Sequence, residues 1–242
     1  MPEQDEISRS KGRLDPVPML LLLLGLGMQF LHFSSAPPGI NGDAARLGLH
    51  ALDLIEEQIW PFYIYHQAGP QPLIVYLQAI AFALFGFTPA ALRGVTAFGG
   101  ALAVPAAYLA GKELFYQEGS VVARRSGLVA AVGMALDPFF NLYCRYGIEG
   151  ALLPAVELLA VMFLWRGLRR GRHLDFVLAG GLVGLSQYVY IVARWFPVAL
   201  AVACGLALVA NRQLLARWRG SLVRCACPTP PARRSKALCV SC

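Results

Sequence analysis

The chain has 242 residues, of which 57% are hydrophobic and only 14% are charged. Because about a quarter of the residues in a soluble domain are charged, this composition excludes an ordinary soluble domain. The net charge of +7 does not indicate nucleic-acid binding, because the basic residues lie between apolar blocks rather than on a face with aromatic residues. The sequence predicts an all-α polytopic membrane protein with about six transmembrane helices and additional interfacial helices.

Seven apolar blocks predict where the helices lie. They cover residues 17–33, 73–87, 92–115, 127–140, 148–168, 176–192 and 196–209. The first block follows Arg9, Lys11 and Arg13, and we interpret it as an uncleaved first helix, with a cleavable signal peptide as the alternative.

The block at 73–87 is short for a spanning helix, which needs about 20 residues. Pro72 suits its first turn, and Gly86 and Pro89 are expected to end it. If this block does not cross, 17 of the 21 Lys and Arg lie on the cytoplasmic side; if it crosses, only six do. The positive-inside rule therefore predicts six spanning helices, a cytoplasmic N-terminus and a block 73–87 that lies at the outer face.

This topology predicts three regions. Residues 1–13 form a cytoplasmic tail, residues 14–210 form the transmembrane domain with an outer loop at 34–91, and residues 211–242 form a basic tail that is disordered or aberrant. Four cysteines of that tail (Cys225, Cys227, Cys239 and Cys242) suggest zinc as an alternative, but their spacing is not that of a standard zinc site.

The outer loop contains an amphipathic pattern that begins at Ala44 and is suited to the membrane interface. Apolar Leu47, Ala51, Leu54 and Ile55 recur at helical spacing opposite Asp53, Glu56 and Glu57. Asp43 occupies the expected N-cap position, where a carboxylate accepts backbone N–H bonds. Further along the loop, His66 suits a base, a ligand or, as the preferred interpretation, a hydrogen-bonding loop residue.

Other outer segments are expected at 137–150 and 188–197, and they carry Arg145, Glu149 and Arg194. The order of motifs resembles the amino-terminal part of the GT-C membrane glycosyltransferases, in particular the bacterial relatives of dolichyl-phosphate-mannose protein mannosyltransferases. The motifs are Asp43 in the outer loop, Pro72-Leu73 with Tyr76-Leu77, "FGFTPAALR" at 85–93 and "LAVPAAYLAGKELF" at 102–115. The segments "DPFFNLYCRYGIEGALLP" and "GLVGLSQYVYIVARWFP" match the same style.

The resemblance implies a transferase that moves a hexosyl or pentosyl group from a polyprenyl-phosphate sugar to a protein or glycan hydroxyl. It implies that Asp43 is the catalytic base and that an outer-face cation stabilises the leaving phosphate. Arg194 is the first candidate for that cation, followed by Arg145 and Arg93. Glu149 either supplies a second carboxylate or pairs with Arg145. His66 completes the set of candidate substrate-binding residues.

No cofactor is expected beyond the lipid-linked donor, and a divalent metal is unsupported because no Asp-x-Asp pair occurs. The expected partners are membrane lipid, the lipid-linked donor and the acceptor, and not nucleic acid. The expected location is the plasma (inner) membrane, with the active side extracytoplasmic.

Two positions depart from the family pattern. Ala44 stands where a glutamate usually follows the catalytic aspartate, and Gln71 stands where a charged residue is common. These departures favour an inactive scaffold as an alternative. Glu157 and Gln187 are the main polar residues within the apolar blocks, and Glu157, in the middle of its block, is the one feature that favours a transporter for a lipid-linked substrate. Because GT-C enzymes generally contain more helices, the chain is expected to be a truncated or frame-shifted product.

Overall fold

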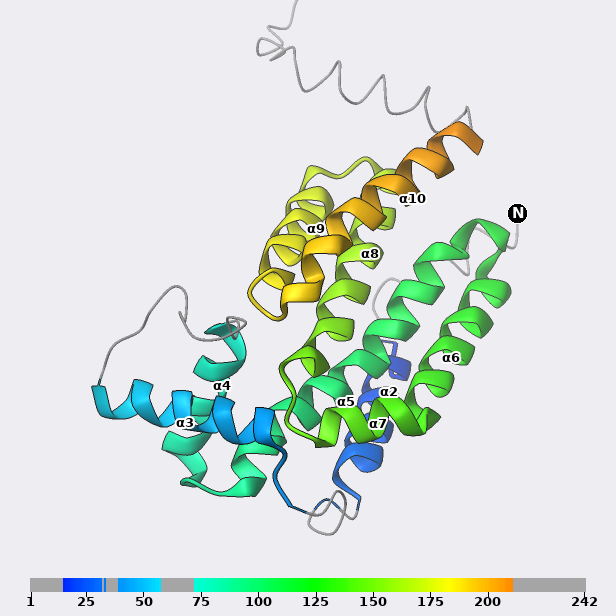
Figure 1. Cartoon of the computed structure of the whole chain (residues 1–242). Coiled ribbons are helices and arrows are strands. Elements are labelled where there is room, and N and C mark those ends of the chain that lie inside the picture. The colour runs from blue at the N-terminus through cyan, green and yellow to red at the C-terminus, as the bar shows by residue number, and fades with distance from the viewer. Residues whose placement is uncertain (1–14, 32, 34–38, 58–71, 211–242) are drawn as a thin grey trace, which may run out of the picture. The chain divides into compact units, whose positions relative to one another are not determined.

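The computed structural model describes residues 15–31, 33, 39–57 and 72–210, with side chains up to Leu206. Within this part of the chain the regular structure is helical and there is no strand, as the sequence predicted (Figure 1). The α-helices are α2 Val17–Phe30, α3 Gly42–Glu57, α4 Pro72–Phe85, α5 Pro89–Leu114, α6 Ser120–Leu136, α7 Pro138–Arg145, α8 Leu153–Arg170, α9 His173–Ser186 and α10 Phe196–Ala210. Short 3-10 helices are η2 Tyr116–Glu118, η3 Glu149–Leu152 and η4 Ile191–Trp195.

The predicted tails at 1–13 and 211–242, with the four tail cysteines, lie outside the described residues, as do His66 and Gln71. By internal contacts the chain divides into a unit at residues 1–198 and a second unit at residues 199–242. Helix α10 begins in the first unit and continues into the second. The packing described below belongs to the first unit.

The α-helices that are long and apolar enough to cross a membrane are fewer than predicted. In the described residues, α5 with 26 residues and the segment Glu149–Arg170 with 22 residues qualify. Helices α6 and α7 qualify together, as one span bent by 57°. Helices α2 and α9 have 14 residues each, or about 21 Å, which is less than the roughly 30 Å of a hydrocarbon core. The prediction of six spanning helices is therefore not confirmed.

Helix α4 begins and ends where the sequence places its boundaries. It starts at Pro72 and ends at Phe85. Gly86 follows with a φ of 77° and donates its N–H to the carbonyl of Phe82 at 2.9 Å. This conformation is common for the glycine that follows a helix, because glycine has no Cβ to oppose a positive φ.

Helix α5 lies at the centre of the first unit and contacts α2, α4, α6 and α8. Small residues allow these close approaches. A Cβ added at Gly127 of α6 would lie 2.6 Å from the carbonyl oxygen of Tyr108, and one at Gly25 of α2 would lie 2.7 Å from that of Ala101. The α5 surface therefore accepts neighbouring backbones only where those side chains are absent.

Ion pairs gather where α5 ends. Lys112 bonds Asp15 at 3.0 Å, and Arg169 of α8 bonds Glu113 with its Nε at 2.7 Å. Arg166 donates to Asp175 of α9 at 2.7 and 2.9 Å. These pairs join the segments that the charge count places on the cytoplasmic side.

Candidate active site

The start of α3 is capped by Asn41, so the prediction that Asp43 occupies the N-cap was wrong. The Oδ1 of Asn41 accepts the N–H of Ala44 at 2.6 Å, and its carbonyl accepts the N–H of Ala45 at 3.0 Å. Asparagine caps as well as aspartate does, and the helix begins two residues earlier than the apolar pattern suggested. Asp43 consequently lies in the first turn of α3.

The amphipathic character of α3 is confirmed. Its buried residues are Ala44, Leu47, Gly48, Ala51 and Leu54, while Asp53, Glu56 and Glu57 are exposed. The buried face belongs to an apolar cluster with residues of α4 and the beginning of α5. This packing fixes which side of α3 faces solvent, and Asp43 is on that side.

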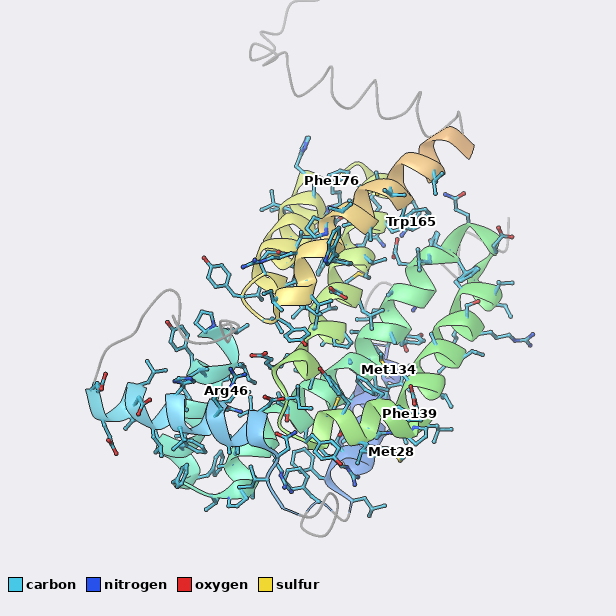
Figure 2. The ribbon with its side chains drawn as sticks, viewed as in Figure 1. Met28, Arg46, Met134, Phe139, Trp165 and Phe176 are labelled. Atoms are coloured by element: carbon cyan, nitrogen blue, oxygen red, sulfur yellow. The ribbon has the colours of Figure 1, made fainter. Side chains whose placement is uncertain are left out.

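The carboxylate of Asp43 is open to solvent. Its side chain is 71% exposed, and it forms an ion pair with Arg46 on the same helix, at 3.8 Å from Nη2 to Oδ1. Arg46 is marked on α3 in Figure 2. An exposed ion pair of this kind contributes little free energy and separates easily. An incoming hydroxyl therefore has access to the carboxylate, which is the first requirement for a general base.

Gly147 joins the first turn of α3 to the first turns of α5. A Cβ at Gly147 would lie 3.2 Å from the Cβ of Ala44 and 3.6 Å from the Cγ of Arg93. Gly147 has a φ of +81°, and Arg93 is only 6% exposed. The structure therefore brings the residue beside Asp43, the base of the Arg93 side chain and the segment after α7 into one junction.

Arg145 contacts backbone rather than a carboxylate. Its Nη2 donates to the carbonyl oxygens of Met28 and Leu31 at the end of α2, the second at 2.8 Å. These carbonyls belong to the last turn of a helix, where they lack intrahelical partners and carry the negative end of the dipole. The structure thus gives Arg145 a different contact from the ion pair with Glu149 that the sequence suggested.

Glu149 lies in a group with two tyrosines. Gly150 packs under the hydroxyl of Tyr143, and a Cβ there would lie 3.3 Å from the Cδ1 of Tyr190. Both Glu149 and Tyr190 interact electrostatically with the Tyr143 phenol. The segments at 137–150 and 188–197 therefore meet at Gly150.

Arg194 is exposed on η4. The segment that carries it is held by Gln187, whose Nε2 donates to the carbonyl of Ala193 at 2.9 Å. The same segment reaches α4, because the N–H of Leu73 donates to the carbonyl of Tyr188 at 3.3 Å. Arg194 thus belongs to a loop that contacts both η3 and the start of α4. Among the described residues, no direct contact between Arg194 and Asp43 is seen.

The predicted outer segments consequently converge through α3, the beginning of α5, η3 and η4. A model of the dolichyl-phosphate-mannose-protein mannosyltransferase family matches residues 68–225, which is more than half of the chain. The chain belongs to this family. No curated protein and no solved structure matches it.

Membership in the mannosyltransferase family and the apolar helices identify an integral membrane protein related to glycosyltransferases. The family match includes Arg93, Arg145, Glu149 and Arg194. Asp43 precedes the matched residues. That it is the catalytic base therefore stays a prediction, which rests on the resemblance of its loop.

Three residues that organise the candidate site were missed in the sequence. Asn41 caps α3, Gly147 forms the junction, and Asn141 supports the bend before α7. Asn41 is a recognisable capping residue, whereas the roles of Gly147 and Asn141 depend on contacts with distant segments. Among the residues that the structure describes, there is no cluster of three His, Cys, Asp or Glu that could hold a metal ion.

Proposed function

We propose that this protein transfers a hexosyl or pentosyl group from a polyprenyl-phosphate donor to a hydroxyl of a protein or glycan. The reaction takes place at the extracytoplasmic face of the plasma membrane, with the N-terminus of the chain in the cytoplasm. The observation that carries the proposal is the exposed carboxylate of Asp43, on a helix whose first turn packs against the family-matched Gly147, which in turn lies beside Arg93.

In the proposed reaction the acceptor oxygen forms a bond to the anomeric carbon as the bond from that carbon to the phosphate oxygen breaks. The hydroxyl proton passes to the Asp43 carboxylate, and the electron pair of the broken bond remains on the lipid phosphate. Attack opposite the leaving group gives inversion. The proposal requires neither a metal nor a cofactor.

The phosphate gains negative charge during this step, so a nearby cation lowers the barrier. We assign that role first to Arg194, because its side chain is exposed on a loop that contacts η3 and α4. The buried Arg93 at the junction is the second candidate. Glu149, in the family-matched part of the chain, would bind a hydroxyl of the donor or the acceptor.

The proposal is tested with Asp43→Asn in the full chain, reconstituted in vesicles with a labelled polyprenyl-phosphate sugar and an acceptor added outside. Transfer should fall by at least about a hundredfold, because general base catalysis contributes roughly 10²–10⁴-fold. Asp53→Asn is the matched control, since Asp53 is an exposed acid on the same helix, 63% exposed, and should leave transfer unchanged. Unchanged transfer by Asp43→Asn, with normal membrane insertion, would exclude Asp43 as the base.

The alternative of an inactive scaffold is supported by Ala44 in place of the usual glutamate. It predicts that the correctly inserted wild-type chain transfers no sugar in the same assay. The transporter alternative depends on Glu157, which lies within α8. Gln187 adds no support for it, because Gln187 follows the last residue of α9 and its amide bonds the Val183 and Ala193 carbonyls.

A further inference from the structure

Arg145, the last residue of α7, and Gly147, two residues further on, contact two helices that are consecutive in the sequence. Arg145 binds carbonyls at the end of α2, and Gly147 packs against Ala44 in the first turn of α3. We propose that Arg145 and Gly147 form a clamp that positions Asp43, so that Arg145 is a positioning residue rather than a ligand of the donor phosphate. The proposal rests on the proposed function of Asp43.

The base of the clamp is held in place by Asn141. Helices α6 and α7 meet at a bend of 57°, and such a bend releases backbone carbonyls from their helical partners. The Nδ2 of Asn141 donates to the carbonyls of Ala135 and Asp137 at 2.7 and 2.8 Å, and its Oδ1 accepts from Gln29 of α2 at 2.8 Å. Helix α7 is therefore bonded to both α6 and α2 before the clamp begins.

The first arm of the clamp is a pair of charge-assisted hydrogen bonds. A guanidinium bound to the carbonyls of Met28 and Leu31 satisfies two acceptors at the end of α2 and places a cation where the helix dipole favours it. A lysine at this position retains the charge but donates from one flexible ammonium instead of a planar group. The arm should therefore depend on the guanidinium more than on the charge.

The second arm is steric and requires glycine. Position 147 has a φ of +81°, and an added Cβ would lie 3.2 Å from the Cβ of Ala44. Ala44 is fully buried, so it has no space into which to withdraw. Since Asp43 precedes Ala44 directly, any displacement of Ala44 also moves the carboxylate.

Hydrogen–deuterium exchange in the full chain tests the clamp without substrate. The N–H of Ala45, which donates to the carbonyl of Asn41 at 3.0 Å, reports on the first turn of α3. The clamp predicts that exchange of this N–H becomes about tenfold or more faster in Arg145→Ala and in Gly147→Ala. Gly133→Ala is the matched control, because an added Cβ there meets nothing within 4 Å.

Faster exchange in Arg145→Ala, with partial recovery by Arg145→Lys, supports the clamp. An exchange rate that is unchanged in Arg145→Ala or in Gly147→Ala, in a correctly inserted chain, overturns it. Because this readout needs no sugar transfer, a silent Asp43→Asn variant would reject the proposed base and leave the clamp standing.

Transfer kinetics then distinguish positioning from phosphate binding. If Arg145 acts through Asp43, Arg145→Ala lowers kcat about tenfold or more, leaves the KM for the donor unchanged and adds nothing to the loss caused by Asp43→Asn. If Arg145 binds the phosphate, the KM for the donor rises and the two losses multiply. The second result overturns the clamp as the function of Arg145.

Discussion

Asn41 performs the capping role that the sequence suggested for Asp43, and this has a chemical consequence. A carboxylate that caps a helix accepts hydrogen bonds from backbone N–H groups, whereas a general base needs an oxygen that is available to accept a proton. With Asn41 bonded to the N–H of Ala44, the Asp43 carboxylate is left with an exposed contact to Arg46. The correction at the helix end therefore agrees with a role for Asp43 as the base.

The separation of the two roles predicts different effects on stability. Asn41→Ala should lower the free energy of unfolding by about 1 kcal/mol, which is typical for loss of an N-cap. Asp43→Ala should have a smaller effect, because its ion pair is exposed. Thermal unfolding in detergent measures both, and a larger loss in Asp43→Ala would contradict the assignment of the cap.

The candidate residues that the sequence suggests, all of them still predictions, are those whose chemistry is local. Asp43 and Arg194 could be selected because a charged residue in an outer loop is informative by itself. Gly147 could not, because its role depends on Ala44 and Arg93, which are far away in the sequence. The sequence around Arg145 suggests a substrate ligand, because it does not show that Arg145 contacts the end of α2, which is far away in the sequence.

At the scale of elements, the sequence predicts helix ends well where glycine or proline marks them. Helix α4 follows this pattern at Pro72 and Gly86, and α5 begins after the Thr88 cap at Pro89. The apolar block at 17–33, however, extends beyond the end of α2. Leu31 has an apolar side chain, but its backbone is extended and ends the helix. Hydrophobicity alone cannot locate such an end, since the contact from Arg145 helps to form it.

The packing of α6 against α5 predicts contrasting effects for two glycines of α6. Gly127→Ala should destabilise the protein by about 1–3 kcal/mol, because its Cβ would lie 2.6 Å from the carbonyl oxygen of Tyr108. Gly133→Ala is the matched control, since an added Cβ there meets nothing within 4 Å.

Gly133→Ala should be neutral or stabilising by up to about 1 kcal/mol, because alanine favours the helical backbone. The midpoint of thermal unfolding in detergent distinguishes the two variants. Equal midpoints for Gly127→Ala and Gly133→Ala would contradict the close α5–α6 contact.

At the scale of the first unit, acidic side chains have different contacts near the end of α5 and near the candidate site. Near the end of α5, Asp15, Glu113 and Asp175 bind Lys112, Arg169 and Arg166. Near the candidate site, Asp43 makes its ion pair within its own helix and remains exposed. The first arrangement serves to join helices, whereas the second leaves a carboxylate accessible.

The Asp15 contact predicts a dependence of stability on pH. Burial raises the pKa of Asp15, but the hydrogen bonds from Lys112, the Val17 N–H and Tyr108, together with the Lys112 charge, outweigh it and lower the pKa below the usual 3.8. Because the folded pKa is the lower one, the stabilisation is present above about pH 4 and is lost as the pH falls through the folded value.

Thermal unfolding of the wild type and of Asp15→Asn, compared between pH 6 and pH 3, measures this contribution. The difference between the two midpoints should shrink as the pH falls, and it should be modest because Asp15 is 40% exposed. A difference that is constant over this range would exclude the ionised carboxylate as the source of the stabilisation.

The sequence could predict an all-helical membrane protein and its family, because composition and motif order carry that information. It could not predict how many helices span, since α2 and α9 prove shorter than their apolar blocks. Apolar residues beyond a helix end, such as Leu31 and Tyr188, extend a hydropathy pattern although their backbone leaves the helix.

The contact between Ala44 and Gly147 also limits how residues can be exchanged between relatives. The family resemblance implies a glutamate at position 44, but here the side chain at that position is fully buried, and an added Cβ at Gly147 would lie only 3.2 Å from it. A glutamate would have to place a carboxylate in this enclosed space. Introducing the Asp-Glu pair into this chain therefore requires more than one substitution, because Gly147 is already the smallest residue and the backbone around residues 44 and 147 would have to move.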